Sequence, residues 1–402
     1  MLARQQSLRQ SSKSLRSFSA MVDRDTNTAT APTRRRVIRN GGAVVGGGLF
    51  SGCLSLNNNP EPIMDTSTNE EGGAYEACLI PTGCVSFEEP PETWIAYQYG
   101  YGDIGVALGV GDGYLATNRP ENYPDEFYDE LPAVSFDADS LTDINSGDKE
   151  IFFELSPDLL LMDPNNAMAR FDWDRDDIRE LESKVAPFFG HFNRRYGYGF
   201  QKEYEVLSLM ETFEAVAELF GERGRYEAIA AVHNEVETAL SDQLPPESER
   251  PEIALLGGGS DPESGEFALL SALGDGYETK QYRDLGVKDV LADVDGADPW
   301  YTTDYEGLLE LDPDAIVIHW TVQMSEDEFA AEFVEPFEDH PVGSELSAVK
   351  EGRVYRGGTA EQGPIINLFQ TEIAAGQLYP DEFGDEELFD RDELNEAIEG
   401  DV

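Results

Sequence analysis

Positive charge is scarce in this chain of 402 residues. It has 28 lysine and arginine residues against 81 aspartate and glutamate residues, which gives a formal net charge of −53. Only seven of the basic residues are lysine. Nucleic-acid binding is excluded as a main function, because phosphate backbones are bound by clustered basic side chains. The acids are spread through apolar-periodic segments, which favours a folded, salt-adapted surface over an acidic disordered tail.

Histidine and cysteine are also scarce, with four and three residues respectively. His191 and His319 could face each other across a cleft, but two histidines without a clear third ligand are a weak zinc site. The glycine-rich turns "GVGDG" and "LLGGGS" lack the lysine and Ser/Thr of a phosphate-binding loop. No Ser-His-Asp or Cys-His order stands out. We therefore expect no resident metal, no cofactor and no catalytic residues.

The apolar stretch near the N-terminus is too short and too weak to span a bilayer as a stable helix. It lies in "TRRRVIRNGGAVVGGGLFSGC", which resembles a twin-arginine export signal at Arg34 and Arg35. The signal pattern is followed by a lipoprotein cleavage box with Cys53 as the lipid acceptor. We expect residues 1–52 to be a signal peptide that starts at Met1 or Met21. The mature protein would be exported and anchored by lipid to the outer face of the cytoplasmic membrane.

The other two cysteines, Cys78 and Cys84, enclose a Pro-Thr-Gly turn in "ACLIPTGC". No histidine lies nearby, and the chain is expected to face an oxidising exterior. A small disulfide loop is therefore favoured over a metal site. The pair lies within residues 53–91, which we predict to be a tether because the run "LNNNPEPIMDTSTNEEGG" has no apolar periodicity.

Short β-rich runs alternate with helical segments on both sides of residues 203–248. We predict strands at 93–98, 112–118, 131–136, 158–163 and 184–189, and then at 251–257, 267–273, 314–320 and 352–358. We predict helices at 150–155, 176–183, 304–311, 326–335 and 364–376. This alternation is typical of an α/β fold with mostly parallel sheets, here an N-terminal lobe at 92–202 and a C-terminal lobe at 249–380.

The segment between the lobes, residues 203–248, has a helical pattern that Gly221 and Gly224 are expected to break in two. The second piece, residues 225–244, would be about 30 Å long at 1.5 Å per residue. That length is enough for a rigid helix that bridges two lobes, with a ligand cleft between them. Residues 381–402 are predicted to be an acidic C-terminal tail or helix.

One thirteen-residue pattern occurs once in each lobe. "EIFFELSPDLLLM" begins at Glu150 and "EGLLELDPDAIVI" begins at Glu306. Pro157 and Pro313 are expected to end a helix and to start a strand. An acid near the start of a helix favours the helix dipole, so Glu150 and Glu306 have a structural explanation too.

These paired segments, "LGVKDVLADV" (285–294) and "VKEGRVYRGGTAEQGPI" (349–365) resemble an ABC-transporter substrate-binding lipoprotein of the iron–siderophore and cobalamin class. The resemblance covers about residues 92–380. It implies extracytoplasmic capture of a ligand and its delivery to a membrane permease with its ATPase, without any chemistry. It also implies that Glu150 and Glu306 dock to basic residues of the permease, one on each lobe. We expect a monomer.

The ligand of such a fold lies beyond the carboxyl ends of the strands. The residues that follow the predicted strands include many aromatic and arginine side chains. Our candidate ligand-binding residues are Tyr99, Tyr101, Arg119, Arg194, Arg195, Tyr198, His319, Trp320, Arg356 and Gln362. Guanidinium groups favour carboxylate, hydroxamate, catecholate or phosphate oxygens, although they could instead pair with the surplus of local acids. We expect an anionic iron(III)–siderophore chelate first, then a corrinoid, then haem. A divalent-metal binding protein and an enzyme on the same scaffold remain as alternatives.

Overall fold

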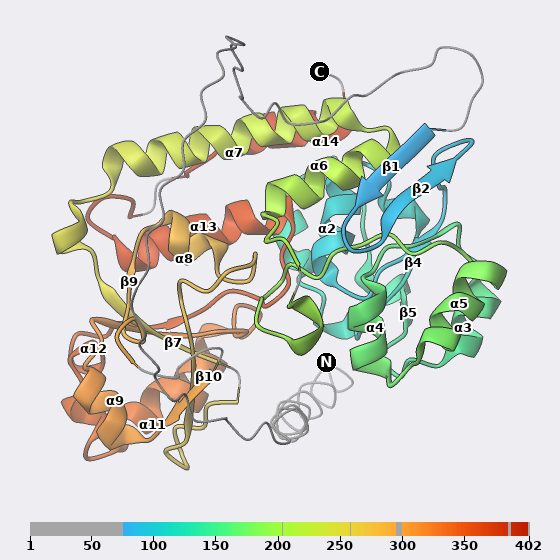
Figure 1. Cartoon of the computed structure of the whole chain (residues 1–402). Coiled ribbons are helices and arrows are strands. Elements are labelled where there is room, and N and C mark those ends of the chain that lie inside the picture. Colours follow the sequence, from blue (N-terminus) through green and yellow to red (C-terminus); the bar gives the residue numbers. More distant parts are fainter. Residues whose placement is uncertain (1–74, 203, 258, 295–299, 385–386, 401–402) are drawn as a thin grey trace, which may run out of the picture. The chain divides into compact units, whose positions relative to one another are not determined.

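The computed structural model describes residues 75–202, 204–257, 259–294, 300–384 and 387–400 (Figure 1). The predicted signal peptide, most of the tether and the lipidation site Cys53 lie outside these residues. Within them, every helix is too short or too polar to cross a bilayer.

The N-terminal lobe is built on four short parallel strands in the order β5-β4-β3-β6. These are β3 (Trp94–Ile95), β4 (Tyr114–Thr117), β5 (Thr142–Asp143) and β6 (Leu159–Leu160). Four helices belong to this lobe: α2 (Tyr99–Ala107), α3 (Lys149–Leu155), α4 (Pro164–Phe171) and α5 (Arg175–Lys184). Both residues of β3 and both residues of β6 are fully buried, as expected for strands that are covered on both faces.

Two predicted strands of this lobe differ from the structure. Residues 131–136 form turns instead, in which Leu131 and Val134 donate to carbonyl groups three residues earlier. Pro132 lacks the N–H group that a central strand needs. Residues 184–189 contribute only an isolated parallel bridge between Phe188 and Leu160, next to another proline.

The C-terminal lobe has a mixed sheet of six strands in the order β10-β8-β7-β11-β12, with β9 also paired to β7. The strands are β7 (Glu252–Leu256), β8 (Phe267–Leu270), β9 (Lys288–Asp289), β10 (Trp300–Thr303), β11 (Ala315–Ile318) and β12 (Val354–Arg356). β7, β9, β11 and β12 are parallel, whereas β8 runs antiparallel to β7 and β10. The prediction of an α/β fold with parallel strands is confirmed, and among the described strands of this sheet β8 alone runs against the others.

The helices of this lobe are α8 (Lys280–Asp284), α9 (Tyr305–Leu311), α10 (Glu326–Phe329), α11 (Glu335–Asp339) and α12 (Ser347–Lys350). A π-helical turn at 330–334 joins α10 to α11, so the predicted helix 326–335 continues for four more residues.

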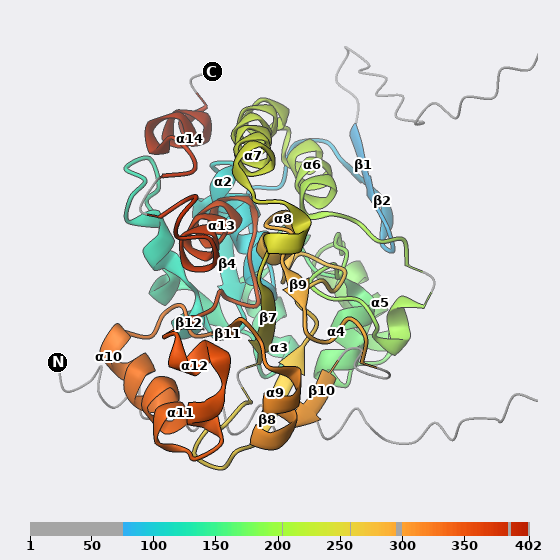
Figure 2. The ribbon, with the colours of Figure 1, turned by 90° about the vertical axis from the view of Figure 1, so that its left-hand side faces the viewer.

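The predicted bridging segment contains two helices. α6 (Leu209–Phe220) ends at Gly221, whose φ of 73° suits glycine at a helix C-terminus. α7 (Arg223–Gln243) is then continuous for 21 residues, so Gly224 does not interrupt it. It is about 30 Å long and lies beside α6, with the late helix α13 (Pro364–Leu378) packed against α2, α6, α7 and α8 (Figures 1 and 2).

The last described helix is part of the folded body. α14 (Arg391–Glu399) packs on α7, and its apolar residues Leu394, Ala397 and Ile398 are buried in the core. Arg225 of α7 donates hydrogen bonds to the carbonyl groups of Ile398 (2.8 Å) and Glu399 (3.1 Å), which satisfies the C-terminus of α14. The predicted tail or helix is therefore a helix over these residues.

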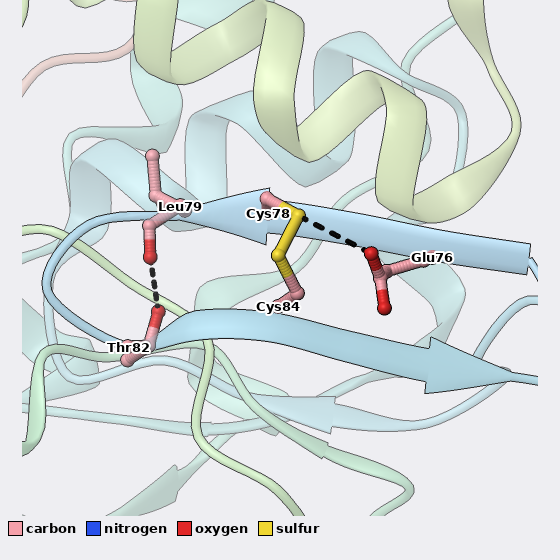
Figure 3. Close-up of a disulfide and its surroundings, with 5 residues drawn as sticks. All are labelled: Glu76, Cys78, Leu79, Thr82 and Cys84. Atoms are coloured by element: carbon pink, nitrogen blue, oxygen red, sulfur yellow. Dashed lines mark hydrogen bonds between the residues drawn. A yellow bond between two sulfur atoms is a disulfide. The ribbon is translucent and has the colours of Figure 1, made fainter. Parts of the chain in front are cut away.

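The C-terminal part of the predicted tether, from Tyr75 onward, is folded. β1 (Tyr75–Leu79) and β2 (Gly83–Phe87) form an antiparallel hairpin, and Cys78 and Cys84 are joined by a disulfide bond between the two strands (Figure 3). Ala77 and Leu79 are buried, and the hydroxyl group of Tyr75 donates to the carbonyl of Leu219 in α6 at 2.5 Å. The prediction of a tether is therefore wrong for residues 75–87. The alternation of exposed and buried residues in β1 covers too few positions to be recognised in the sequence.

Candidate ligand-binding site

The repeated segment occupies equivalent places in the two lobes. α3 and α9 are each seven residues long, and each begins after an aspartate whose side chain caps the helix, Asp148 or Asp304. Each is followed by a residue in the left-handed conformation and then by a strand, β6 or β11. Glu150 and Glu306 are both exposed, at the second position of their helices.

The Pro-Asp pair of each copy fastens a neighbouring strand. Oδ2 of Asp158 accepts hydrogen bonds from the backbone N–H groups of Glu92 (3.2 Å) and Thr93 (2.9 Å), at the start of β3. Oδ2 of Asp314 accepts one from the backbone of Glu252 (2.8 Å), at the start of β7. The aspartates therefore have the same architectural role in both lobes.

The loops that follow the strands bring charged residues of the two lobes together. Arg194 and Arg195 come from the N-terminal lobe, in the loop after Phe188. Their partners come from three loops of the C-terminal lobe, which follow β8, β11 and β12. We call this group the inter-lobe cluster: Arg194, Arg195, Tyr277, Glu278, His319, Trp320 and Glu361.

Two carboxylates pair with the two arginines. Arg194 lies 3.2 Å from Oε1 of Glu278 and 3.1 Å from Oε1 of Glu361, and Arg195 lies 2.6 Å from Oε2 of Glu278. The indole N–H of Trp320 also donates to Glu278, at 3.2 Å, and Tyr277 donates to Glu361. The side chain of Glu278 is 2% exposed, so these pairs are shielded from water and from salt.

Main-chain hydrogen bonds reinforce this contact between the lobes. The N–H group of Tyr277 donates to the carbonyl of Asn193 at 2.9 Å, and that of Glu278 donates to the carbonyl of Arg194 at 3.1 Å. Gly276 makes this close approach possible: its φ is 110°, and a Cβ atom there would lie 2.3 Å from the carbonyl oxygen of Arg194. A side chain at residue 276 would therefore push the two loops apart.

Burial and charge set the ionisation of the cluster. Burial by itself would raise the pKa of Glu278, but Arg194 and Arg195 hold that pKa well below its usual range. Burial raises the pKa of Glu361, against the opposing effects of Arg194 and of the hydrogen bond from Tyr277. Burial lowers the pKa of His319, so its imidazole is neutral at pH 7. Glu278 is therefore the carboxylate of the cluster whose ionised form is most strongly favoured.

Unsatisfied polar atoms also gather at the strand ends. His319 follows β11 and is completely buried; its Nε2 lies 3.4 Å from Oε1 of Glu278, whereas its Nδ1 has no hydrogen-bond partner among the described residues. Gln98 and Asn118, which follow β3 and β4, each have a buried side-chain oxygen with no hydrogen-bond partner in the described part of the chain. A buried polar group without a partner costs about 1–3 kcal/mol. Trp320 adds backbone strain, because its φ of 69° is unfavourable for a bulky residue. Costs of this kind concentrate at ligand sites.

A family model for periplasmic binding proteins matches residues 95–360, which is well over half of the chain. The chain belongs to the periplasmic binding protein family. Periplasmic binding proteins are substrate-binding components of ABC importers rather than enzymes. They act outside the cytoplasm and work together with the permease subunits of the importer. No curated protein matches the sequence.

Solved structures with a similar fold come from several bacteria. A TroA-like periplasmic binding protein, FepB from Veillonella parvula, is 18% identical with a TM-score of 0.56, over 80% of this chain and 94% of that protein. A second periplasmic binding protein from V. parvula is 16% identical with a TM-score of 0.56, over 76% and 98%. CeuE from Helicobacter pylori with Ni(II) bound is 12% identical with a TM-score of 0.52, over 77% and 90%. At these identities the likeness shows the fold alone.

Only some of the predicted site residues of this periplasmic binding protein lie in the inter-lobe cluster. Arg194, Arg195, His319 and Trp320 do, and Gln362 lies beside it, where its amide donates to the carbonyl of Tyr277 at 2.5 Å. Gln362 is fully buried and holds the loop that carries Tyr277 and Glu278 in place.

The remaining predicted residues have other surroundings. The hydroxyl groups of Tyr99 and Tyr101 are engaged inside the N-terminal lobe, with the carbonyl of Arg119 (2.8 Å) and with the backbone of His191. Arg356 donates to the carbonyl of Met324. Tyr198 is exposed and stacks on Phe200, with ring centroids 5.7 Å apart.

The structure does not join His191 to His319. The ring nitrogens of His191 bond to the carbonyl of Ile80 (2.7 Å) and to the hydroxyl of Tyr196 (2.9 Å). Across the described part of the chain, the one group of potential metal ligands is Glu76, Cys78 and Cys84. Both of these sulfurs are oxidised to the disulfide, so they offer no thiolate to a metal.

Three residues of the cluster are not among the sequence predictions: Tyr277, Glu278 and Glu361. Glu278 and Glu361 are two of the 81 acidic residues of the chain, and nothing in the local sequence distinguishes them. Gly276 is the one signal nearby, since glycine in a loop after a strand indicates a close approach of another backbone.

Proposed function

We propose that this periplasmic binding protein captures an anionic iron(III)–siderophore-type chelate and delivers it to the permease of an ABC importer. The observation that carries the proposal is the adjacent pair Arg194, which is 19% exposed, and Arg195, which is buried, at the meeting point of the two lobes. The chain has few cations, so two adjacent guanidinium groups at this place are a strong indication of an anionic ligand.

The surroundings of the pair suit a chelate with aromatic or planar oxygen donors. The guanidinium carbon of Arg194 lies 5.8 Å from the centroid of the Trp320 ring, and Tyr198 and Phe200 form a stacked pair on the same loop as Arg194. Guanidinium forks bind carboxylate, hydroxamate and catecholate oxygens in two-pronged fashion, and flat rings stack on aromatic side chains.

The decisive experiment is a spectrum of the protein purified from its own host, together with native mass spectrometry. An iron charge-transfer band and a bound mass of siderophore size would support the proposal. A corrin spectrum, a Soret band or a bare divalent cation would each replace the chelate with one of the alternative ligands. Calorimetric titration with iron(III) tris-catecholate and iron(III) tris-hydroxamate would then rank the donor chemistry.

We further propose that the protein is exported by the twin-arginine route and tethered by lipid at Cys53. The sequence pattern at Arg34 and Arg35 supports this proposal. Lysine at both arginine positions should leave the unprocessed precursor in the cytoplasm. Cys53→Ser should release the exported protein from the membrane, and retention of this variant on the membrane would refute the lipid anchor.

Docking to the permease is proposed to use Glu150 and Glu306. Both are exposed and hold equivalent helix positions, one in each lobe. The double variant Glu150→Arg and Glu306→Arg should keep its ligand affinity but lose uptake. Glu182→Arg with Glu338→Arg is the matched control, because these two exposed glutamates also lie one in each lobe. Normal uptake by the first double variant would leave the repeat with an architectural role only.

A further inference from the structure

The arginines that would bind an anionic ligand already have anionic partners inside the protein. Arg194 has two, Glu278 and Glu361, and Arg195 has Glu278. Both carboxylates come from the other lobe and are almost fully buried, with side chains 2% and 10% exposed. Buried ion pairs give little net stability compared with apolar packing, so this arrangement calls for an explanation other than stability.

We propose that Glu278 and Glu361 are internal competitors of the ligand: they pair with Arg194 and Arg195, hold the lobes together, and are displaced by the oxygens of an anionic chelate. This inference rests on the proposed function, since it assumes an anionic ligand at the two arginines. It adds that ligand affinity depends partly on the free energy needed to displace Glu278 and Glu361 from the arginines. A ligand with less negative charge replaces these carboxylates poorly.

The contacts of Glu361 make it the carboxylate that is easier to displace. It faces Arg194 at 3.1 Å and Tyr277, with Glu278 as a repelling neighbour, and it makes no ion pair with Arg195 among the described contacts. Glu278 in contrast pairs with both arginines, accepts from Trp320 and lies 3.4 Å from Nε2 of His319. We therefore expect a chelate to take the position of Glu361 first.

The test is the affinity of Glu361→Gln for two probes, iron(III) tris-catecholate, which is strongly anionic, and iron(III) tris-hydroxamate, whose iron centre is uncharged. Glutamine keeps the shape and one acceptor oxygen for Arg194, but it removes the competing charge. Glu372→Gln is the matched control, because Glu372 forms a similarly shielded pair with Arg391 in α13 and α14, away from the cluster. Glu278→Gln is the second variant, with folding checked by circular dichroism.

Glu361→Gln should bind the tris-catecholate about tenfold more tightly or better, since a charge-assisted pair no longer has to be broken. Its affinity for the tris-hydroxamate should rise less, and Glu372→Gln should behave as the natural protein does. Weaker binding would mean that Glu361 contacts the ligand directly, and unchanged binding would mean that it does not compete. Either result overturns the inference.

Hydrogen exchange without any chelate separates this inference from the proposed function. The N–H groups of Tyr277 and Glu278 bond across the lobes, so their exchange should become faster in Glu361→Gln if the ion pairs hold the lobes together. If the natural protein binds neither probe, the proposed function fails. Faster exchange would then still support the holding role of the carboxylates, and unchanged exchange would remove it.

Discussion

Asp103 offers a test of how the two lobes are joined. It lies in α2 of the N-terminal lobe, is completely buried, and caps a helix that follows the last strand of the other lobe. Its Oδ2 accepts hydrogen bonds from the N–H groups of Ile365 and Ile366, both at 3.0 Å, in the first turn of α13. Its Oδ1 accepts one from the hydroxyl of Tyr128 at 2.8 Å. This carboxyl group thus holds the start of α13, which begins two residues after Gln362.

Burial raises the pKa of Asp103 from 3.8 to about 7, even though these three hydrogen bonds favour the ionised form. Between these two values the folded protein holds a proton that the unfolded chain has released. Stability contributed by this group is therefore greatest at low pH and is lost as the pH rises through about 7. Between about pH 5 and about pH 7.5, Asp103 alone should change the free energy of unfolding by about 2.5 kcal/mol.

The variant Asp103→Asn should remove this pH dependence with little change in geometry. The amide oxygen can still accept from Ile365 and Ile366, and Tyr128 can donate to Tyr123, which lies 2.9 Å away. Urea unfolding at both pH values, in about 1 M salt to screen the acidic surface, gives the two free energies for each protein. Asp176→Asn, at an exposed site, is the control. Parallel pH profiles for the natural protein and Asp103→Asn would refute the assignment of a proton to this carboxyl group.

Three further predictions concern the inter-lobe contact, the hairpin and the long helix. Gly276→Ala should speed hydrogen exchange at residues 277–278 and weaken chelate binding, because the added Cβ atom cannot fit against Arg194. Unchanged exchange would contradict this prediction. Gly224→Ala is the control, because Gly224 has open space around it. Replacing Cys78 and Cys84 together by serine should lower the free energy of unfolding by about 2 kcal/mol in urea titrations, as expected for so short a loop. Equal stability of the natural protein under oxidising and reducing conditions would refute this contribution of the disulfide. Small-angle scattering should show little contraction on chelate binding, because the continuous helix α7 resists bending, and a large contraction would mean that the lobes swing about another segment.

Much of the C-terminal lobe could be predicted from the sequence. The four predicted strands at 251–257, 267–273, 314–320 and 352–358 each contain an observed strand, because a short apolar run between turn residues is a strong local signal. The sequence could not show that β8 runs antiparallel, since direction depends on pairing with β7. Residues 131–136 have the apolar content of a strand, but Pro132 and the local turns decide otherwise.

The site could be predicted only in part. The pair Arg194 and Arg195 stands out because cations are rare in this chain, and the structure places both in the inter-lobe cluster. Their acidic partners lie 83 to 167 positions further along the chain, so no local pattern connects them. Tyr99 and Tyr101 show the opposite problem: they follow a strand as a ligand-binding residue would, but their hydroxyl groups satisfy backbone atoms of their own lobe.

The repeated segment shows how one pattern can serve two purposes at different residues. Asp158 and Asp314 have a structural role, because each accepts a hydrogen bond from the backbone at the start of the neighbouring strand. Loss of either carboxylate would loosen one sheet. Glu150 and Glu306 lie one helix length earlier, exposed, and make no contact across the sheet among the described hydrogen bonds and ion pairs. Folding therefore accounts for the aspartates but places no demand on the glutamates beyond a small helix-dipole effect. Because the aspartates fix each helix relative to its sheet, they also fix the position of each glutamate on its lobe. A permease that contacts both lobes would then meet one carboxylate at an equivalent point of each, and this geometric equivalence is what gives the docking proposal its force.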